Sequence, residues 1–260
     1  DVLISSAVVL SSGRRDSRVC SLDYENYGSY PIINIDGRQL IFVSNIIYDL
    51  STWEVYIELP SGLISYSSNG EFVAVSEYDT LSLYSLSTRE LIYQISMFTR
   101  GCIEFGVDNE IFRLDREFTY ETETGELLYQ KWGDLSSNGR LVASGDGVLD
   151  AWNGQVIYPH ITYGIFSPDS TIIASDGEIY DILTGELIFN LGSSGGENVF
   201  SLDSKYINIE DTGVFNLETG ELIIETRDWG VQFSRDSSMV TVYDDDLRRD
   251  LNGVYSLPSG

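Results

Sequence analysis

The feature that most constrains this chain is an internal repeat, seen as one short turn pattern that returns along the sequence. An apolar run follows each turn, as in TGELIFN and TGELIIE. The intervals between the last residues of successive turns are 36, 36, 29, 31 and 35. Self-similarity at a period of this size indicates a repeat architecture. The turns read STWE at 51–54, STRE at 87–90, ETGE at 123–126, WNGQ at 152–155, LTGE at 183–186 and ETGE at 218–221.

Two further markers have the same period. An aromatic residue stands six positions before the end of each turn, with Leu149 as the exception: Tyr48, Tyr84, Tyr120, Tyr180, Phe215 and Tyr255. Each repeat also has one Asp or Asn in a tight-turn context, as in SNGE and SPDS: Asp36, Asn69, Asp108, Asn138, Asp169, Asp203 and Asp236. Short polar side chains of this kind bond to the local backbone and tolerate left-handed conformations, so we expect a turn at each.

Each repeat predicts four short strands, a to d. In the fifth repeat these are 164–166, 171–174, 178–181 and 186–190. The runs are β-rich and bounded by turn residues, and no stretch sustains a helical period. Four-stranded antiparallel units of about 37 residues, repeated seven times, predict an all-β chain folded as a seven-bladed β-propeller.

The two ends of the sequence complete the pattern. The chain finishes in LPSG and starts with DVLIS, and together these letters match a turn followed by strand d. We therefore expect residues 1–9 to form the last strand of the seventh blade, which removes the free sheet edges at the seam. The prediction is one domain, 1–260, with blades that end near 59, 96, 131, 159, 192, 226 and 260.

The segment Phe166–Leu191 resembles a WD40 repeat, and the other six repeats resemble it more loosely over nearly the whole chain. The resemblance implies a seven-bladed ring closed by its N-terminal strand. Tyr or Phe replaces the tryptophan of the WD40 dipeptide, and no Gly-His pair occurs, so the histidine network typical of that family is expected to be missing. The TGE hairpins also resemble PQQ-type propeller repeats. The acid of the dipeptide survives at Asp49, Glu121, Asp150 and Asp181.

Composition excludes several classes of partner. With 41 acidic against 15 basic residues the net charge is −26, whereas proteins that bind nucleic acids or anionic membranes need clustered Lys and Arg. No apolar run reaches the ~18 residues of a membrane span. We therefore expect a soluble protein, with the cytoplasm as the favoured compartment. The two cysteines, Cys20 and Cys102, form no disulfide framework or metal-ligand spacing, and we expect them to be unbridged.

Catalytic signatures are missing from the sequence. The chain has one histidine, His160, in a predicted loop, and we expect it to be structural or solvated. No HExxH, P-loop, GxSxG or dinucleotide motif occurs. Asp244, Asp245 and Asp246 are consecutive rather than alternating as in an EF-hand loop. We expect no catalytic residues, no cofactor and no bound metal, although paired acids for glycoside hydrolysis remain an open alternative.

The strongest site signal is a pair of long insertions on one predicted face, the loop-rich face, where the b–c loops and the d–a connections emerge. One insertion covers about 11–29 and the other 243–253, and both flank the seam. Long loops in a compact domain are usually functional or mobile. An alternative is that they are solvated, or that their arginines pair with Asp244–Asp246 to brace the closure. The candidate partner-binding residues here are Arg14, Arg15, Arg18, Tyr24, Tyr27, Asp244, Asp245, Asp246, Arg248 and Arg249.

A second signal is a ring of acids in the b–c loops. Carboxylates on low-dielectric walls focus negative potential, which attracts a basic peptide, while aromatic residues serve as anchors. A uniformly acidic coat is the competing interpretation. The candidate residues are Glu77, Tyr78, Asp79, Asp115, Asp146, Asp176, Glu210, Asp211, Trp132 and Trp229.

These observations lead to a main functional hypothesis and two alternatives. The first is a non-enzymatic interaction scaffold that binds a basic or amphipathic protein partner on the loop-rich face. An alternative is a propeller enzyme, or a ligand- or carbohydrate-binding protein, with a carboxylate-lined axial pocket. A further alternative is an engineered or excised repeat propeller with no activity of its own.

Overall fold

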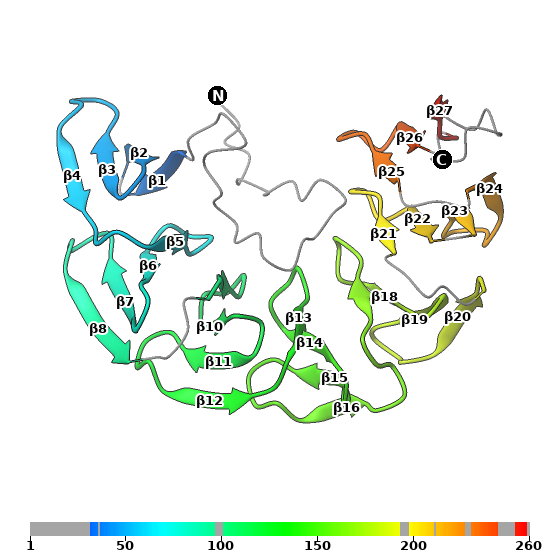
Figure 1. Ribbon diagram of the computed structural model, residues 1–260, viewed down its shortest axis with the longest axis horizontal. Helices are drawn as coiled ribbons and strands as arrows, with labels where there is room; N and C mark the ends of the chain where they lie inside the picture. Colours follow the sequence, from blue (N-terminus) through cyan, green and yellow to red (C-terminus); the bar gives the residue numbers. More distant parts are fainter. Residues whose placement is uncertain are drawn as a thin grey trace. The chain divides into compact units, whose positions relative to one another are not determined.

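Every regular element in the described part of the chain is a β-strand, and the 27 strands form seven antiparallel sheets (Figure 1). The structure is a computed structural model that describes residues 32–35, 37–96, 101–192, 198–210, 212–226, 230–243 and 253–258. None of these residues is in a helix, so none belongs to a helix long and apolar enough to cross a lipid bilayer. The prediction of an all-β chain with seven repeated sheets is confirmed.

The first three sheets follow one another along the chain. Sheet 1 consists of β1 (Ile32–Ile35), β2 (Arg38–Val43), β3 (Ile46–Asp49) and β4 (Val55–Glu58). Sheet 2 consists of β5 (Leu63–Tyr66), β6 (Phe72–Ser76), β7 (Thr80–Ser85) and β8 (Leu91–Ser96). Sheet 3 consists of β9 (Ile103–Phe105), β10 (Ile111–Leu114), β11 (Phe118–Glu121) and β12 (Leu127–Gln130).

The last four sheets continue this order. Sheet 4 consists of β13 (Gly133–Leu135), β14 (Leu141–Ser144), β15 (Gly147–Asp150) and β16 (Val156–Tyr158). Sheet 5 consists of β17 (Ile165–Phe166), β18 (Ile172–Ser175), β19 (Glu178–Asp181) and β20 (Leu187–Asn190). Sheet 6 consists of β21 (Val199–Phe200), β22 (Tyr206–Ile209), β23 (Gly213–Asn216) and β24 (Leu222–Glu225). Sheet 7 consists of β25 (Gly230–Phe233), β26 (Met239–Tyr243) and β27 (Gly253–Ser256).

Strands pair in chain order within each sheet, so we call them a, b, c and d. The a–b and c–d turns therefore lie at one end of a sheet. The b–c hairpin lies at the other end, with the start of strand a and the end of strand d, and we name this the b–c end. The strands predicted for the fifth repeat agree with sheet 5 to within one residue at each boundary. Sheet 7 has three described strands, and the closing strand predicted for residues 1–9 lies outside the described residues.

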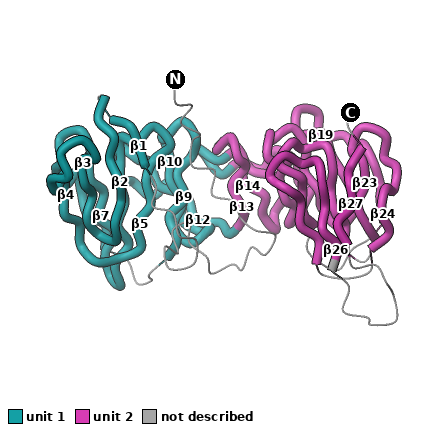
Figure 2. The backbone as a smooth tube through the Cα atoms, turned by 90° about the horizontal axis from the view of Figure 1, so that it is seen from above, with its two compact units in different colours: residues 1–11, 15–132, 151–154 teal, residues 12–14, 133–150, 155–260 magenta. Residues whose placement is uncertain are grey.

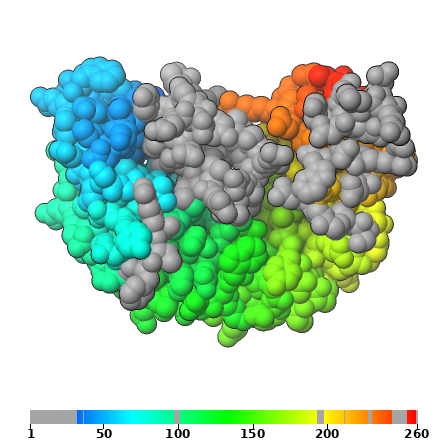
Figure 3. Space-filling model, viewed as in Figure 1, coloured from blue at the N-terminus to red at the C-terminus, as the bar shows by residue number. Residues whose placement is uncertain are grey.

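The chain forms two compact units (Figure 2). Sheets 1–3 belong to the first unit together with the turn 151–154, and sheets 4–7 belong to the second. Inside the first unit the surfaces of sheets 1 and 2 are continuous (Figure 3, blue and cyan). Each unit is described separately below.

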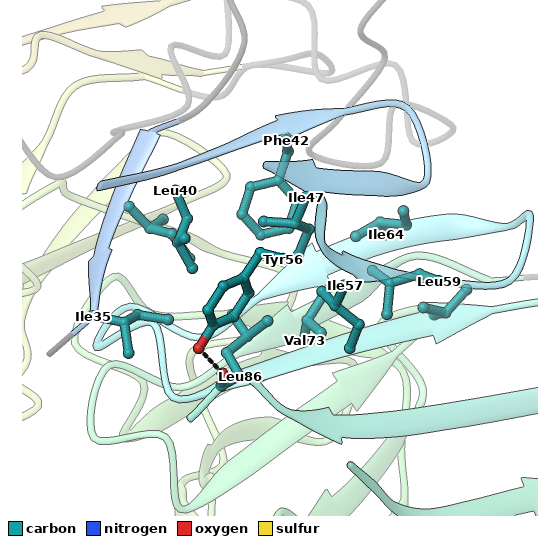
Figure 4. Packing of buried hydrophobic residues seen from close by; sticks show 12 residues of the cluster. Ile35, Leu40, Phe42, Ile47, Tyr56, Ile57, Leu59, Ile64, Val73 and Leu86 are labelled. Atoms are coloured by element: carbon teal, nitrogen blue, oxygen red, sulfur yellow. Dashed lines mark hydrogen bonds between the residues drawn. The ribbon is translucent and has the colours of Figure 1, made fainter. Parts of the chain in front are cut away.

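The hydrophobic core lies between successive sheets. One cluster joins sheets 1 and 2 and contains Phe42, Ile47 and Val73, all fully buried (Figure 4). The next cluster joins sheets 2 and 3 and contains Ala74, which neighbours Val73 on the same strand. Side chains alternate between the two faces of a strand, so an inner strand with apolar residues on both faces supplies two cores at once. Burying each large aliphatic or aromatic side chain stabilises the fold by about 1.5–3 kcal/mol.

The a–b turns show how the Asp/Asn marker acts. In sheet 7 the Asp236 carboxylate accepts hydrogen bonds from the Ser234 and Ser238 hydroxyls, at 2.6 and 2.8 Å. The side-chain bond predicted for this marker is confirmed. The left-handed residue, however, is the one that follows, such as Ser237 with a φ of 55°. In the other six repeats the left-handed residue is Gly37, Gly70, Asn109, Gly139, Ser170 or Ser204.

These left-handed residues also join neighbouring sheets when they carry a polar side chain. The Ser170 hydroxyl of sheet 5 accepts a bond from the Asn138 amide of sheet 4, at 3.0 Å. Ser204 and Ser237 accept equivalent bonds from Asp169 and Asp203, both at 3.2 Å. A left-handed conformation is unfavourable for serine, so each such bond offsets part of that backbone cost.

The c–d turns carry a second contact between sheets. Tyr158 of strand d in sheet 4 donates its hydroxyl to the Ile182 carbonyl of sheet 5, at 3.0 Å. Its ring lies over Gly185, where a Cβ atom would come within 2.4 Å of the ring. Gly185 has a φ of 71° and belongs to the repeated TGE turn. The same ring-over-glycine contact joins Tyr93 to Gly125, Tyr129 to Gly154 and Phe189 to Gly220.

Candidate functional site

The predicted partner-binding residues divide into two groups. The seam residues and two others lie outside the described residues: Arg14, Arg15, Arg18, Tyr24, Tyr27, Asp211, Trp229, Asp244, Asp245, Asp246, Arg248 and Arg249. The described group lies at the b–c ends of sheets 2–6: Glu77, Tyr78, Asp79, Asp115, Trp132, Asp146, Asp176 and Glu210. The candidate site is therefore built from this second group.

The acids of this group occupy equivalent hairpins. Ser144 pairs with Gly147, and Ser175 pairs with Glu178, so Asp146 and Asp176 each belong to a two-residue turn between strands b and c. The turn of sheet 5 has the positive φ that is favoured in two-residue hairpins, 49° at Asp176 and 77° at Gly177. Both aspartate side chains are exposed, as is Asp115 in sheet 3. Short hairpins thus present carboxylates at fixed places on the b–c ends.

Glu210 differs from the other acids because it is only 4% exposed. It follows strand b of sheet 6, where Ile209 pairs with Gly213 across the hairpin. A buried carboxylate contributes much less to the potential that an approaching partner meets than an exposed one does. The exposed part of the predicted acidic set is therefore carried by Asp79, Asp115, Asp146 and Asp176, and Glu77 is half-buried.

A buried arginine organises the b–c end of sheet 3. Arg113 is fully buried at a strand-b position where sheets 2, 4 and 5 have alanine. Its Nη2 donates to the Arg116 carbonyl in the hairpin and to the Lys131 carbonyl after strand d, both at 2.6 Å. Its Nε donates to the Thr119 hydroxyl at 3.1 Å. Arg113 therefore ties the hairpin to the connection that carries Trp132, which is half exposed.

The sequence predictions missed Tyr163, which lies between β16 and β17 at the b–c end of sheet 5. Its side chain is 70% exposed, and its φ is 52°. An aromatic residue directly before a glycine at the start of strand a also occurs at Trp132. That shared pattern was the available signal, but it does not reveal which residue the ring contacts.

The single histidine has structural contacts. His160 Nε2 lies 3.1 Å from the Gly185 carbonyl oxygen, and its ring packs edge-on against Tyr158 and Tyr180. Tyr180 in turn donates its hydroxyl to Glu178, and this bond raises the pKa of Tyr180 to about 12. In the described chain, no group of three or more His, Cys, Asp or Glu side chains is arranged to hold a metal ion.

The expectation of unbridged cysteines is wrong for Cys102. This residue precedes β9 and is disulfide-bonded, and no described cysteine is free. The only other cysteine in the sequence is Cys20, which lies outside the described residues. A disulfide depends on which residues meet in space, and sequence spacing between two isolated cysteines does not reveal this.

Comparison of the chain with known proteins finds no match, either among protein-family models or among curated proteins.

Proposed function

We propose that the seven sheets are the blades of a closed, WD40-like β-propeller, and that the chain is a non-enzymatic scaffold that binds a basic or amphipathic segment of a partner protein. The partner would lie on the face formed by the b–c ends. The observation that carries the proposal is the recurrence of exposed acids in the b–c hairpins of four consecutive sheets, 2–5.

The geometry of sheet 7 supports the closure. In sheets 2, 3, 5 and 6 the residue that leaves strand c bonds back to the residue just before strand b, as Ile182 N does to the Thr171 carbonyl at 2.9 Å. Leu257 N makes the equivalent bond to the Ser238 carbonyl at 2.8 Å. The chain after β27 thus follows the path that leads to strand d elsewhere. Residues 1–9 carry the matching strand-d pattern, and we assign the fourth strand of sheet 7 to them.

The chemistry of the b–c ends supports a basic partner. Exposed carboxylates at repeated positions add their fields, which speeds the encounter with a cationic segment and favours it over an acidic one. Tyr78 and Trp132 lie at the same ends of their sheets, 80% and 50% exposed. Tyrosine and tryptophan supply large contact area at little entropic cost, so they suit the apolar side of an amphipathic segment.

The test compares two triple charge reversals of equal size. One variant carries Asp115→Lys, Asp146→Lys and Asp176→Lys in the b–c hairpins. The control carries Glu126→Lys, Glu186→Lys and Glu221→Lys, which are exposed acids in the c–d turns at the opposite ends of sheets. Binding of a synthetic amphipathic peptide of lysine and leucine is measured by titration calorimetry at physiological ionic strength.

We expect the hairpin variant to lose affinity about ten-fold or more and the control less than about three-fold, because local charges act more strongly than distant screened ones. Circular dichroism and thermal unfolding verify that both variants are folded. Equal losses in the two variants would mean that the charge is a general acidic coat, and the proposal would be wrong.

A further inference from the structure

Cys102 has a fixed place at the b–c end of sheet 3, directly before strand a. Its carbonyl accepts a hydrogen bond from the Asp115 amide in the b–c hairpin at 2.7 Å, and the next residue, Ile103, is only 3% exposed. Gly101 on its other side is buried, and a Cβ atom there would lie 2.8 Å from the Asp115 Cβ. The backbone of Cys102 is therefore held between the hairpin and the core.

The composition of the chain identifies the partner of Cys102. This residue is disulfide-bonded, and no described cysteine is free. The sequence contains two cysteines, and the other one is Cys20. Within this sequence, Cys20 is thus the only residue that can supply the second sulfur atom. Any other arrangement requires a bond between two molecules.

We infer that a disulfide joins Cys20 to Cys102 and that the chain acquires it in an oxidising compartment. Cys20 belongs to the insertion at about 11–29, so the bond attaches this insertion covalently to the b–c end of sheet 3. Disulfides persist in extracellular, periplasmic and ER-luminal environments, and they are rare where glutathione and thioredoxin keep thiols reduced. This compartment replaces the cytoplasm expected from the sequence, and the inference does not depend on the proposed function.

The bond forms by thiol–disulfide exchange with a disulfide oxidant, either glutathione disulfide or a disulfide-bonded oxidoreductase. The thiolate of one cysteine attacks the oxidant, so that a mixed disulfide forms and the first thiol of the oxidant leaves. The thiolate of the other cysteine then attacks the protein sulfur of the mixed disulfide and releases the second thiol. The two cysteines together lose two protons and two electrons, and the oxidant takes them up as two thiols.

The spacing of the two cysteines indicates a permanent cross-link. They stand 82 positions apart in the sequence, so the bond closes a long loop. Closing such a loop restricts the unfolded chain far more than the folded chain, and this stabilises the fold. Catalytic dithiols often have a Cys-X-X-Cys motif, and the sequence contains none. We expect loss of the bond to lower the melting temperature by about 10 °C.

The first test defines the bond in the purified full chain, produced by export to the bacterial periplasm and kept without reductant. Thiol titration in guanidinium chloride is expected to find no free thiol before reduction and two per chain after it. Mass spectrometry of unreduced peptides should recover one cross-linked pair that contains Cys20 and Cys102. Two free thiols before reduction, or a disulfide-linked dimer on a non-reducing gel, would overturn the inference.

Thermal unfolding of three variants separates the bond from the side chains. Cys20→Ser, Cys102→Ser and the double variant should lose the same melting temperature as the reduced natural chain, because each lacks the same cross-link. The double variant is the control for the reductant and should not respond to it. Cys20→Ser covers the case in which a change at Cys102 disturbs sheet 3. A natural chain whose melting temperature is the same with and without reductant would contradict the structural role.

The compartment is tested in the source cells. Cells are quenched in acid, free thiols are labelled with a maleimide that carries polyethylene glycol, and the protein is detected by immunoblot. We expect no mass shift without prior reduction and two adducts per chain after it. Two adducts without prior reduction would show that the protein is kept reduced in the cell, and the assignment to an oxidising compartment would be wrong.

Discussion

The ring-over-glycine contact between sheets 4 and 5 leads to a quantitative prediction about stability. Gly185 has a φ of 71°, and a Cβ atom there would approach the Tyr158 Cε1 to 2.4 Å and its Cδ1 to 2.5 Å. Alanine in a left-handed conformation costs about 1–2 kcal/mol. Forcing an additional carbon against a packed ring adds about 1–3 kcal/mol. Gly185→Ala should therefore lower the free energy of unfolding by about 2–5 kcal/mol.

Gly37 provides the matched control. Its φ is 77°, but a Cβ atom there would meet nothing within 4 Å. Gly37→Ala should therefore show only the backbone cost of about 1–2 kcal/mol. The measurement is urea unfolding followed by circular dichroism, with the slope checked for constancy so that the difference reports stability.

A double-mutant cycle isolates the contact itself. Tyr158→Ala removes the ring and the hydroxyl that bonds to Ile182 and Leu183. If the clash is the cause, Gly185→Ala should cost about 1–3 kcal/mol less in the Tyr158→Ala background than in the natural chain. The reasoning is refuted if Gly185→Ala is no worse than Gly37→Ala, or if the two changes at the contact are additive.

Two further predictions concern the a–b turns. The bonds from the Ser234 hydroxyl and from Ser238 hold the pKa of Asp236 at about 2, below its ordinary value of 3.8. Its stabilising contribution is thus complete above about pH 5 and lost as the pH falls toward 2. The stability difference between the natural chain and Asp236→Asn, measured by thermal unfolding, should shrink over that window; a constant difference would contradict this. Ser170→Ala should destabilise by about 1 kcal/mol, because it removes the bond to Asn138 and keeps the backbone cost, whereas Ser170→Gly should be nearly neutral. Urea unfolding of both variants checks this, and equal losses would count against a left-handed cost at this position.

Local structure was largely predictable from sequence. The strands of sheet 5 match their predicted ranges to within one residue, because β-rich runs bounded by Asp, Asn and Gly turns are defined by neighbours along the chain. The a–b turns were predicted with the correct side-chain bonds. Only the left-handed position was off by one residue, because the marker side chain accepts the hydrogen bonds of the turn while the backbone adopts positive φ at the next residue.

The candidate site was only partly predictable. Placing Asp115, Asp146 and Asp176 in b–c hairpins needs only the strand order, and the structure agrees. The exposure of a hairpin acid was not predictable, because Glu210 occupies a comparable place and is buried by its surroundings. The disulfide at Cys102 was also missed, since a disulfide depends on which residues meet in space.

The sequence by itself determined the repeat, its strands and the end of each sheet at which the acids lie, because these follow from interactions over a few residues. Only the tertiary structure decided how one sheet meets the next. Gly185 is a turn glycine within its own sheet. Because it has no side chain, it also leaves room for the ring of Tyr158 from sheet 4. Gly145 has the same relation to Tyr163. Such contacts join residues that are remote along the chain, and composition and periodicity do not reveal which side chain fills which gap.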